Sequence, residues 1–388
     1  MSVKNYDLII SGLGCAGLSL AVRLSKAGLT VGKRILLIDR EHKNSNNRTW
    51  CFWEMGPGFF EEIVHKTWDH AWFHSNDFSK LLELEPYVYK MIRGLDFYQH
   101  CMKIINDDQA FEIIYDEVLS VQSTEGIGVC KTATKTYHAP QVFNSILFDK
   151  PVLCRGEFFL KQHFKGWFIK TKEDVFDPRT ATLMDFRPDQ QHGTTFIYVM
   201  PFSANSALVE YTLFTEDTLT QKEYDQGLDL YLRAQLGLDE WEIIEEEFGI
   251  IPMTNHRFQR QNGCIVNIGT AGGMTKASSG YTFRFIQKDT ERIVQQMSKH
   301  SKPNYQHRDH SRFFWYDSIF LNILQLKKLH GADIFTDLFS QNDAGKILKF
   351  LDNETSFQEE VKILWSMPQW PFMKAGVQEG LKAIKTIK

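Results

Sequence analysis

The chain has 388 residues, with 44 Lys and Arg side chains against 48 Asp and Glu, so its formal net charge is −4 with neutral histidines. This near balance leaves no basic excess, and we expect no nucleic-acid partner. Hydrophobic residues make up 43% of the chain and aromatic residues 13%, which excludes intrinsic disorder and provides enough apolar surface for more than one domain. The 30 phenylalanines suit a large core or a pocket for an apolar ligand.

Three further classes of protein are disfavoured. No uninterrupted apolar run reaches about 18 residues, so we expect no membrane-spanning helix. Residues 1–7 contain no cleavable apolar segment, so we expect no secretory signal and a cytoplasmic protein. The six cysteines are far apart and form no Cys-x-x-Cys pair, so we expect reduced thiols and no metal site.

The first predicted elements form a nucleotide-binding unit. Residues 6–11 have the length and apolar character of a strand, and a Gly-x-Gly-x-x-Gly pattern follows at Gly12, Gly14 and Gly17. Apolar side chains then recur at helical spacing until Gly28, which is typical of the residue that ends a helix. This strand–turn–helix context makes the pattern a specific fingerprint, because the glycines allow a tight turn, a close approach to pyrophosphate and close helix packing.

A second strand is predicted at residues 34–39, and its last residue, Asp39, lies about 20 residues beyond the last glycine, where an acid accepts from a ribose hydroxyl. A second glycine-rich turn follows a predicted strand at residues 266–273 and precedes a helical pattern. FAD is long enough to contact both turns, so we favour FAD over NAD. The expected cofactor contacts are Gly12, Leu13, Gly14, Cys15, Ala16, Gly17, Asp39, Arg40, Arg48, Trp50, Gly269, Thr270, Ala271, Gly272 and Gly273.

The remaining chain predicts a three-part organisation. Residues 66–160 are strand-rich, and residues 142–144 resemble the strand that closes the nucleotide domain. Antiparallel strands are expected at 164–171, 195–200 and 206–214. Beyond residue 300 the pattern is helical. The predicted division is a discontinuous FAD-binding domain at 1–65, 90–155 and 255–300, an antiparallel-sheet substrate domain at 66–89 and 156–254, and a helical region at 301–388.

One acidic residue on this sheet is chemically interesting. Alternation places Glu210 on the same strand face as Leu208 and Thr212, and the preceding strand offers Phe196 and Tyr198. Apolar surroundings raise a carboxyl pKa and keep the group protonated, as a general acid requires. Periodicity alone leaves a solvated glutamate as the more common alternative.

Several sequence blocks resemble the FAD-dependent lycopene cyclases, bacterial beta-cyclase type. The most specific are the Leu-Val-Glu strand at 207–212 and the glycine-rich stretch at 269–283. The other matching blocks are 47–53, 176–178, 183–186, 196–201 and 249–253. They follow the family's order and cover most of residues 6–290.

The resemblance implies an α/β protein with an α+β insert: a Rossmann-type FAD-binding domain, an antiparallel-sheet substrate domain and a helical C-terminal region, similar to the flavin hydroxylase-like fold. It implies cyclisation of the psi end groups of lycopene, or a related acyclic carotenoid, to beta-ionone rings, giving gamma-carotene and then beta-carotene. Reduced FAD would stabilise the carbocation or donate the proton, with NAD(P)H as external reductant. The family's proposed acid falls on Glu210.

A hydrocarbon substrate requires an apolar pocket, and aromatic faces stabilise a cation. We expect its wall to include Trp50, Phe52, Trp53, Trp167, Phe196, Tyr198 and Tyr281. Two departures from the family matter. Tyr211 replaces a second acid, which leaves Glu216 or Asp217 as the nearest alternative in sequence. Residues 144–146 replace an Asp-Ala/Gly-Arg turn, which leaves the contact with the cofactor there undefined.

Alternatives remain open at this point. A flavin-dependent monooxygenase or polyprenyl reductase of the same fold would use the same glycine turns, and a non-catalytic carotenoid carrier would not need Glu210. Because the substrate partitions into bilayers, we also expect peripheral association with the inner membrane. The tail containing Trp365, Trp370 and Phe372 would provide this contact, unless it is a terminal helix packed on the body.

Overall fold

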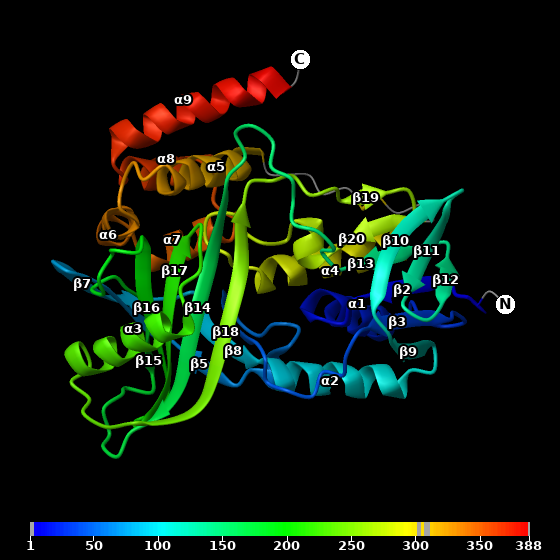
Figure 1. Ribbon diagram of the computed structural model, residues 1–388, viewed down its shortest axis with the longest axis horizontal. Helices are drawn as coiled ribbons and strands as arrows, with labels where there is room; N and C mark the ends of the chain where they lie inside the picture. Colours follow the sequence, from blue (N-terminus) through cyan, green and yellow to red (C-terminus); the bar gives the residue numbers. More distant parts are fainter. Residues whose placement is uncertain (1–3, 301–303, 306–310, 387–388) are drawn as a thin grey trace.

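The computed structural model describes residues 4–300, 304–305 and 311–386. Figure 1 shows two regions side by side: a parallel sheet with its helices, and a larger, mainly antiparallel sheet with C-terminal helices above it. This arrangement confirms the predicted α/β fold with an antiparallel-sheet region and a helical C-terminal region. The three-part domain division remains a proposal.

The first region is built on a six-stranded sheet. Its strands, in spatial order, are β19 (Gln261–Asn262), β20 (Ile265–Asn267), β13 (Val142–Asn144), β2 (Leu8–Ser11), β3 (Ile35–Asp39) and β9 (Phe111–Tyr115). All neighbours pair in parallel except β19 with β20. β2 and β3 are fully buried, as their continuous apolar sequences require in a parallel sheet.

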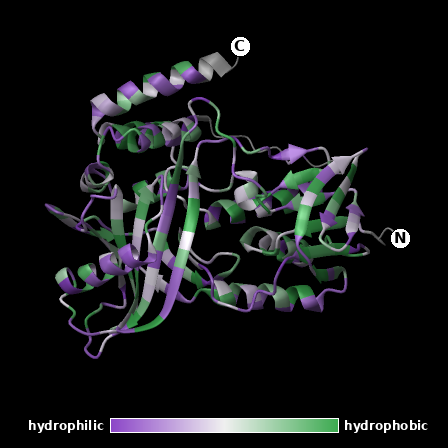
Figure 2. Ribbon diagram, viewed as in Figure 1, coloured by the Kyte–Doolittle hydropathy of each residue, from purple (hydrophilic) through white to green (hydrophobic). Residues whose placement is uncertain are grey.

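Each face of this sheet is covered. On one face, the core packs the sheet against α1 (Cys15–Lys26), α2 (Gly94–Asp107) and α4 (Phe283–Lys299). On the other face lies a small sheet of β1 (Lys4–Asn5), β12 (Thr136–Ala139), β11 (Ile127–Thr132) and β10 (Val118–Thr124). The strands are therefore hydrophobic on both faces, which Figure 2 shows as green in this part of the molecule.

The second region is built on a seven-stranded sheet. Its strands, in spatial order, are β18 (Glu242–Thr254), β14 (Phe159–Lys170), β17 (Ser206–Thr215), β16 (Thr194–Ser203), β15 (Thr180–Asp185), β6 (His70–Ser75) and β7 (Phe78–Glu83). Only β15 and β6 pair in parallel. The predicted strands at 164–171, 195–200 and 206–214 are confirmed as parts of β14, β16 and β17. Helix α3 (Gln221–Ala234) covers one face, and the other face packs in part against the C-terminal helices and in part lines the site.

A three-stranded sheet lies beside α4 and contributes to the space between the regions. It consists of β4 (Thr49–Glu54), β8 (Val88–Arg93) and β5 (Lys66–Trp68), with antiparallel pairing throughout. Strand β4 carries the aromatic block that sequence analysis singled out. Its inner residues are buried against both main cores.

The C-terminal region is helical, as predicted. It comprises α5 (Ser311–Gln325), α6 (Gly331–Gln341), α7 (Ala344–Leu351), α8 (Phe357–Trp365) and α9 (Gln369–Thr386). These helices share a hydrophobic core with the seven-stranded sheet. Within the described ranges, no helix combines the length and apolar character that crossing a bilayer requires.

Two helices were not predicted. Helix α2 lies in the stretch interpreted as strand-rich, and α3 lies in the stretch interpreted as antiparallel sheet. Both had recognisable signals. The buried residues Tyr224, Leu228 and Leu232 of α3 recur at helical spacing, and Thr220 forms a capping box with Glu223 that marks the start of the helix. Both helices lie between segments with clear strand patterns, so the whole stretches were assigned to strands.

Candidate active site

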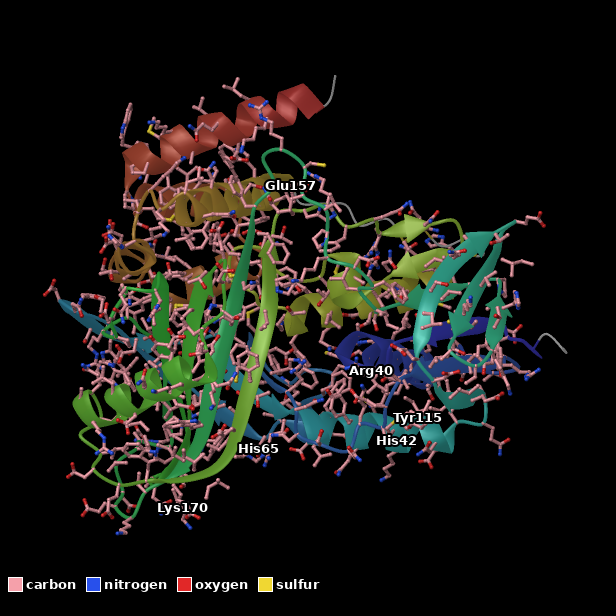
Figure 3. The ribbon with its side chains drawn as sticks, viewed as in Figure 1. Arg40, His42, His65, Tyr115, Glu157 and Lys170 are labelled. Atoms are coloured by element: carbon pink, nitrogen blue, oxygen red, sulfur yellow. The ribbon has the colours of Figure 1, made fainter. Side chains whose placement is uncertain are left out.

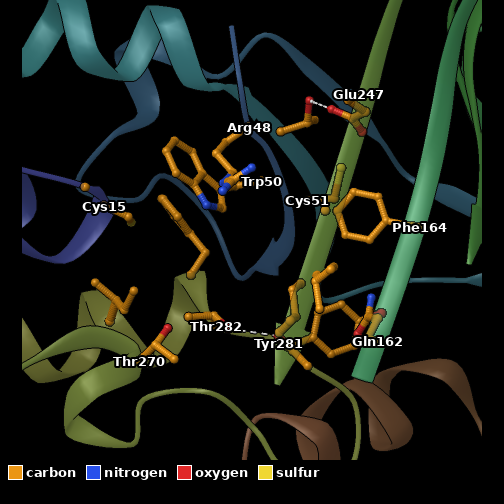
Figure 4. A pocket seen from close by; sticks show the side chains of 18 of the residues that line it. Cys15, Arg48, Trp50, Cys51, Gln162, Phe164, Glu247, Thr270, Tyr281 and Thr282 are labelled. Carbon is orange, nitrogen blue, oxygen red and sulfur yellow. Dashed lines mark hydrogen bonds between the residues drawn. The ribbon is translucent and has the colours of Figure 1, made fainter. Parts of the chain in front are cut away.

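The candidate site is a cavity of about 380 Å³ between the glycine turns and the face of the seven-stranded sheet that lies opposite α3 (Figure 4). Its lining includes Gly14 and Cys15 at one end and Glu210 on β17 at the other. The nucleotide fingerprint and the buried acid, which are far apart in sequence, therefore belong to one cavity.

The first glycine turn has the features of a phosphate site. Gly14 is the residue before α1, and no side chain caps the free N–H groups of the first helical turn. A side chain at Gly14 would meet no atom within 4 Å, so this helix end is open. A Cβ on Gly17 would lie 2.0 Å from the carbonyl oxygen of Gly12, which explains why helix and turn need glycine here. Open N–H groups at a helix start bind anions such as a pyrophosphate.

The segment that departs from the family pattern stabilises this turn. Ser145 Oγ donates to the carbonyl oxygens of Ser11 and Gly12, both at 3.0 Å. Asn144 accepts from Ser11 Oγ at 2.9 Å and donates to Asn267 Oδ1 at 2.9 Å. These two side chains thus hold together the ends of three neighbouring strands. Ser145 also lines the cavity.

The two predicted residues at the end of β3 have different surroundings. Asp39 accepts from the backbone N–H of Leu13 at 2.6 Å and from Lys43 Nζ at 3.0 Å, so its carboxylate fixes the first turn. Arg40 lies at the surface (Figure 3) and pairs with Glu41 at 3.7 Å. Neither residue lines the 380 Å³ cavity.

The second glycine turn packs directly on the first. Residues Gly269–Gly272 form a short 3-10 turn before α4, and a Cβ on Gly269 would lie 2.8 Å from Ala16 Cβ. Gly269 and Thr270 line the cavity, whereas Gly272 and Gly273 line a neighbouring one. Ala271 is buried and belongs to neither lining. The close contact between turns brings α4 to the same end of the cavity as α1.

Arg48 and Trp50, the other expected cofactor contacts, both line the cavity near β4. Trp50 is held by edge contacts with the rings of Phe97 and Tyr98. Arg48 donates to the backbone oxygen of Asn47 at 2.9 Å. Their placement leaves both side chains available to a ligand that extends from the first turn.

Glu210 lies at the sheet end of the cavity and is only 8% exposed. Tyr198 is its direct partner on β16, as expected from the sequence, and Gly166 is its partner on β14. Thr212 Oγ1 donates to Glu210 Oε1 at 2.7 Å. Burial, followed by repulsion from Glu247, raises the pKa of Glu210 well above its ordinary value. Both effects favour the protonated form of the carboxyl.

Sequence analysis missed the second acid of this site. Glu247 on β18 also pairs with Gly166, from the other side of β14, and is likewise 8% exposed. Thr49 Oγ1 donates to Glu247 Oε2 at 2.6 Å, which Figure 4 marks with a dashed line. Burial raises the pKa of Glu247, while hydrogen bonds from Thr49 and Glu210 oppose this rise. Only the pairing register of β17 and β18 with β14 brings Glu247 close to Glu210, and this register cannot be derived from a single sequence.

Glu216 and Asp217, the alternative acids nearest to Glu210 in sequence, lie outside the cavity. Glu216 accepts from Gln325 Nε2 at 2.7 Å, and Asp217 is fully exposed within 4.0 Å of Lys161. Neither lines the cavity. Tyr211, the residue directly after Glu210, faces the core under α3 because successive strand residues alternate between faces.

Aromatic rings surround the acid end. Tyr198 and Tyr281 line the cavity as expected, and their phenol oxygens lie 3.4 Å apart. Tyr89 and Phe164, which were not predicted, also line it. Burial, the largest cause, raises the pKa of Tyr198, Tyr281 and Tyr89, so these rings carry no charge at neutral pH.

Four of the expected wall residues do not line this cavity. Trp53 and Phe196 are fully buried in the core, with Trp53 packed edge-on against Tyr281. Phe52 stacks on Phe283 and faces a neighbouring cavity. The prediction for Trp167 was wrong, because Trp167 is adjacent to Gly166 and therefore faces the core under α3.

One buried amide tests whether a flavin fits. Gln162 on β14 lines the cavity and is 7% exposed, and its Oε1 atom has no hydrogen-bond partner. Gly280 makes room for it, since a Cβ there would lie 2.1 Å from Gln162 Oε1. A buried acceptor needs a donor. A hydrocarbon has none, whereas a flavin ring carries N–H groups, so the residues present fit this cofactor.

Comparison with known sequences identifies the same family along most of the chain. The family model described as "Lycopene cyclase protein" matches residues 7–376. A lycopene beta cyclase of Capsicum annuum is 25% identical over 303 residues, which cover 71% of this chain and 57% of the relative. A lycopene beta-cyclase of Pantoea ananas is 21% identical over 298 residues, which cover 74% of each chain. The chain thus aligns with little more than half the length of the plant relative.

Comparison with solved structures shows the fold. A geranylgeranyl bacteriochlorophyll reductase-like protein of Thermoplasma acidophilum has a TM-score of 0.68 at 14% identity, covering 96% of this chain and 99% of that one. A probable FAD-dependent monooxygenase of Pseudomonas aeruginosa has a TM-score of 0.57 at 12% identity, covering 84% and 98%. The chain therefore shares the fold of these two proteins, one of which is described as FAD-dependent.

Proposed function

Because this chain belongs to the lycopene cyclase family, we propose that it is an FAD-dependent lycopene beta-cyclase. It converts the psi end groups of lycopene, or a related acyclic carotenoid, to beta-ionone rings, giving gamma-carotene and then beta-carotene without net redox change. The observation that carries this proposal is the cavity that joins an open dinucleotide turn at Gly14 to the buried carboxyl of Glu210.

Glu210 is the proposed proton donor. Its raised pKa favours the protonated form of a carboxyl that lines the cavity, as a proton donor requires. Addition of this proton to the terminal double bond creates a tertiary cation, and a neighbouring double bond of the same molecule attacks it to close the ring. Loss of a ring proton then completes the isomerisation, so the site needs both a proton donor and a proton acceptor.

The aromatic and apolar side chains around Glu210 can stabilise a carbocation and keep water away from it. The rings of Tyr198, Tyr281 and Tyr89 offer π faces, which attract positive charge. Cys51 and Met200, whose sulfur atoms lie 3.2 Å apart, add apolar lining. Exclusion of water protects the cation, because water would convert it to an alcohol. Reduced FAD, when bound at the glycine turns, would supply an electron-rich ring that stabilises positive charge, and NAD(P)H is the proposed external reductant.

We also propose peripheral contact with a membrane through α9. Trp370, Met373 and Val377 are exposed on α9 at spacings that place them on one face of the helix. Phe372 instead packs against the core, so α9 has a packed face and an exposed apolar face. Figure 2 shows the resulting bands of hydrophilic and hydrophobic residues along α9. This apolar face fits an inner-membrane surface that holds the substrate.

Expression in a lycopene-producing bacterium tests the proposed activity. Pigments are separated by chromatography, and wild-type protein is expected to yield beta-carotene or gamma-carotene. Unchanged lycopene, with soluble and flavin-loaded protein present, would overturn the proposal. A flavin monooxygenase or reductase would consume NAD(P)H in proportion to product. A non-catalytic carrier would be unaffected by Glu210→Gln, whereas a cyclase would lose its activity.

A further inference from the structure

We propose that Glu210 and Glu247 form a carboxyl–carboxylate pair that holds a single proton, in which Glu247 is the positioning residue that keeps this proton on Glu210. This inference rests on the proposed function for its chemical role. The pair itself is a property of the structure and can be tested without a substrate.

Gly166 is the backbone feature that allows the pair. It lies between Glu210 on β17 and Glu247 on β18, in direct register with both. A Cβ on Gly166 would lie 3.0 Å from Glu247 Cγ and 2.9 Å from Leu208 Cδ1. Any larger residue would therefore displace the side chains that meet above it. With glycine there, the Glu210 and Glu247 side chains have room above β14, and both are 8% exposed and line the same cavity.

Two threonines fix the outer oxygens of the pair. Thr212 donates to Glu210 Oε1 at 2.7 Å, and Thr49 donates to Glu247 Oε2 at 2.6 Å. Each hydroxyl occupies one oxygen of its carboxyl. Glu210 Oε2 and Glu247 Oε1 carry no hydrogen bond from these two threonines, and the proposal places the shared proton between them. This arrangement gives the shared proton a defined position.

The surroundings make double ionisation unfavourable. Like charges on two buried, touching carboxyls repel strongly, so one proton is retained. Burial is the first cause of the raised pKa of both groups, and the hydrogen bond between them raises the pKa of Glu210 while lowering that of Glu247. Because the Thr49 hydroxyl and the charge of Arg48 favour the charged form of Glu247, the proposal places the proton on Glu210. The other titratable or charged groups that act on the pair are Arg48, Cys51, Tyr89, Tyr198, Glu245 and Tyr281.

The pair can both donate the proton that starts the reaction and accept the proton that the ring loses. Before reaction, the pair carries one negative charge and the hydrocarbon is neutral. When Glu210 gives its proton to the terminal double bond, the pair carries two negative charges and the substrate one positive charge. Loss of the ring proton to Glu210 restores the starting state. The total charge of the site never changes, and no external base or electron is needed.

Infrared difference spectra of the FAD-loaded protein across pH test the pair directly, through the C=O stretch of a buried protonated carboxyl. Wild-type protein is expected to show one such carboxyl at neutral pH, and Glu210→Gln is expected to lose it. In Glu247→Gln the band should remain, but its titration should move about 1–3 pH units lower, because the neighbouring anion is gone. Glu247→Asp should recover part of this shift.

Two further variants distinguish loss of the carboxyl pair from a general disturbance of the fold. Gly166→Ala pushes the carboxyls apart and should shift the titration in the same direction as Glu247→Gln. Glu246→Gln is the matched control. Glu246 directly precedes Glu247 on β18, and its carboxylate pairs with Lys165 at 3.1 Å rather than with Glu210. It should titrate as wild type. A Glu247→Gln band that titrates as wild type, or a second protonated carboxyl at neutral pH that is lost in Glu247→Gln, would overturn the pair.

Cyclase assays across pH give the functional readout. In Glu247→Gln the alkaline limb of the profile should move to lower pH, with a loss of roughly tenfold or more at neutral pH and an unchanged KM for lycopene. If wild type cyclises lycopene but this profile does not move, the positioning role is wrong and the proposed function stands. If wild type shows the infrared pair but no cyclisation, the proposed function fails and the pair stands.

Discussion

Tyr198 lies directly opposite Glu210 on neighbouring antiparallel strands, β16 and β17. Its phenol oxygen lies 3.4 Å from that of Tyr281, which comes from the segment between the second glycine turn and α4. The proposed acid is thus flanked by a ring from its own sheet and a ring from the cofactor region. A substrate end group that reaches Glu210 must lie against these rings.

This relationship predicts that the ring of Tyr198 matters more than its hydroxyl. Tyr198→Phe keeps the π face and should change the cyclisation rate by less than about threefold. Tyr198→Leu removes it and should lower the rate roughly tenfold, since a cation–π contact in a dry site is worth about 2 kcal/mol or less. Quantitative pigment chromatography in a lycopene-producing host measures both. Equal losses in the two variants would assign the effect to the hydroxyl instead.

Gly17 is predicted to be essential for cofactor binding. A Cβ on Gly17 would lie 2.0 Å from the Gly12 carbonyl oxygen, so Gly17→Ala forces α1 away from the turn. We expect the purified variant to carry less than a tenth of the wild-type flavin, measured by the ratio of flavin to protein absorbance. Gly380→Ala, in α9 with no atom within 4 Å, is the matched control and should keep its flavin. Full flavin loading of Gly17→Ala would contradict the assignment of this turn.

The raised pKa of Glu210 has a consequence for stability. The folded protein keeps a proton that the unfolded chain releases above about pH 4.3, so the contribution of Glu210 to folding stability is greatest below that pH and falls as the pH rises towards the folded-state pKa. The slope is at most about 1.4 kcal/mol per pH unit for this group. Glu210→Gln lacks the effect and should gain stability relative to wild type as the pH increases. Parallel curves of Tm against pH for the two proteins would contradict it.

The exposed face of α9 predicts lipid binding. A variant with Trp370, Met373 and Val377 all changed to Gln should bind anionic and neutral liposomes at least several-fold less than wild type, in flotation assays. Leu230→Gln is the control, since Leu230 is exposed on α3, far from α9 in Figure 1. Unchanged flotation of the triple variant would place membrane contact elsewhere or exclude it.

Local signals in the sequence were sufficient for the nucleotide unit. Gly12, Gly14, Gly17 and Asp39 are specified by turn geometry and short spacing, and the structure places each one beside the first turn. The strand containing Glu210 was equally predictable, because its alternation and short connection to the preceding strand define the pairing with Tyr198. These features depend on neighbours close in sequence.

Non-local pairing could not be predicted in the same way. Glu247 reaches Glu210 only because β18 and β17 both pair with β14, and no periodicity of one strand reveals this order. The correct face of Trp167 depended on the register that places Gly166 beside the acid. The positions of Trp53 and Phe196 in the core rather than in the lining depend on packing between distant segments.

Cyclisation in heavy water measures the central claim most directly, because the proton that Glu210 delivers exchanges with solvent. Purified, FAD-loaded protein is supplied with lycopene and reductant in D₂O, and the products are analysed by mass spectrometry. After the protein has been equilibrated in D₂O, the account predicts one retained deuterium in the ring formed at the first turnover, and no labelled cyclic product with Glu210→Gln. Rings formed without deuterium, or labelled rings formed at the wild-type rate by Glu210→Gln, would contradict protonation by this carboxyl.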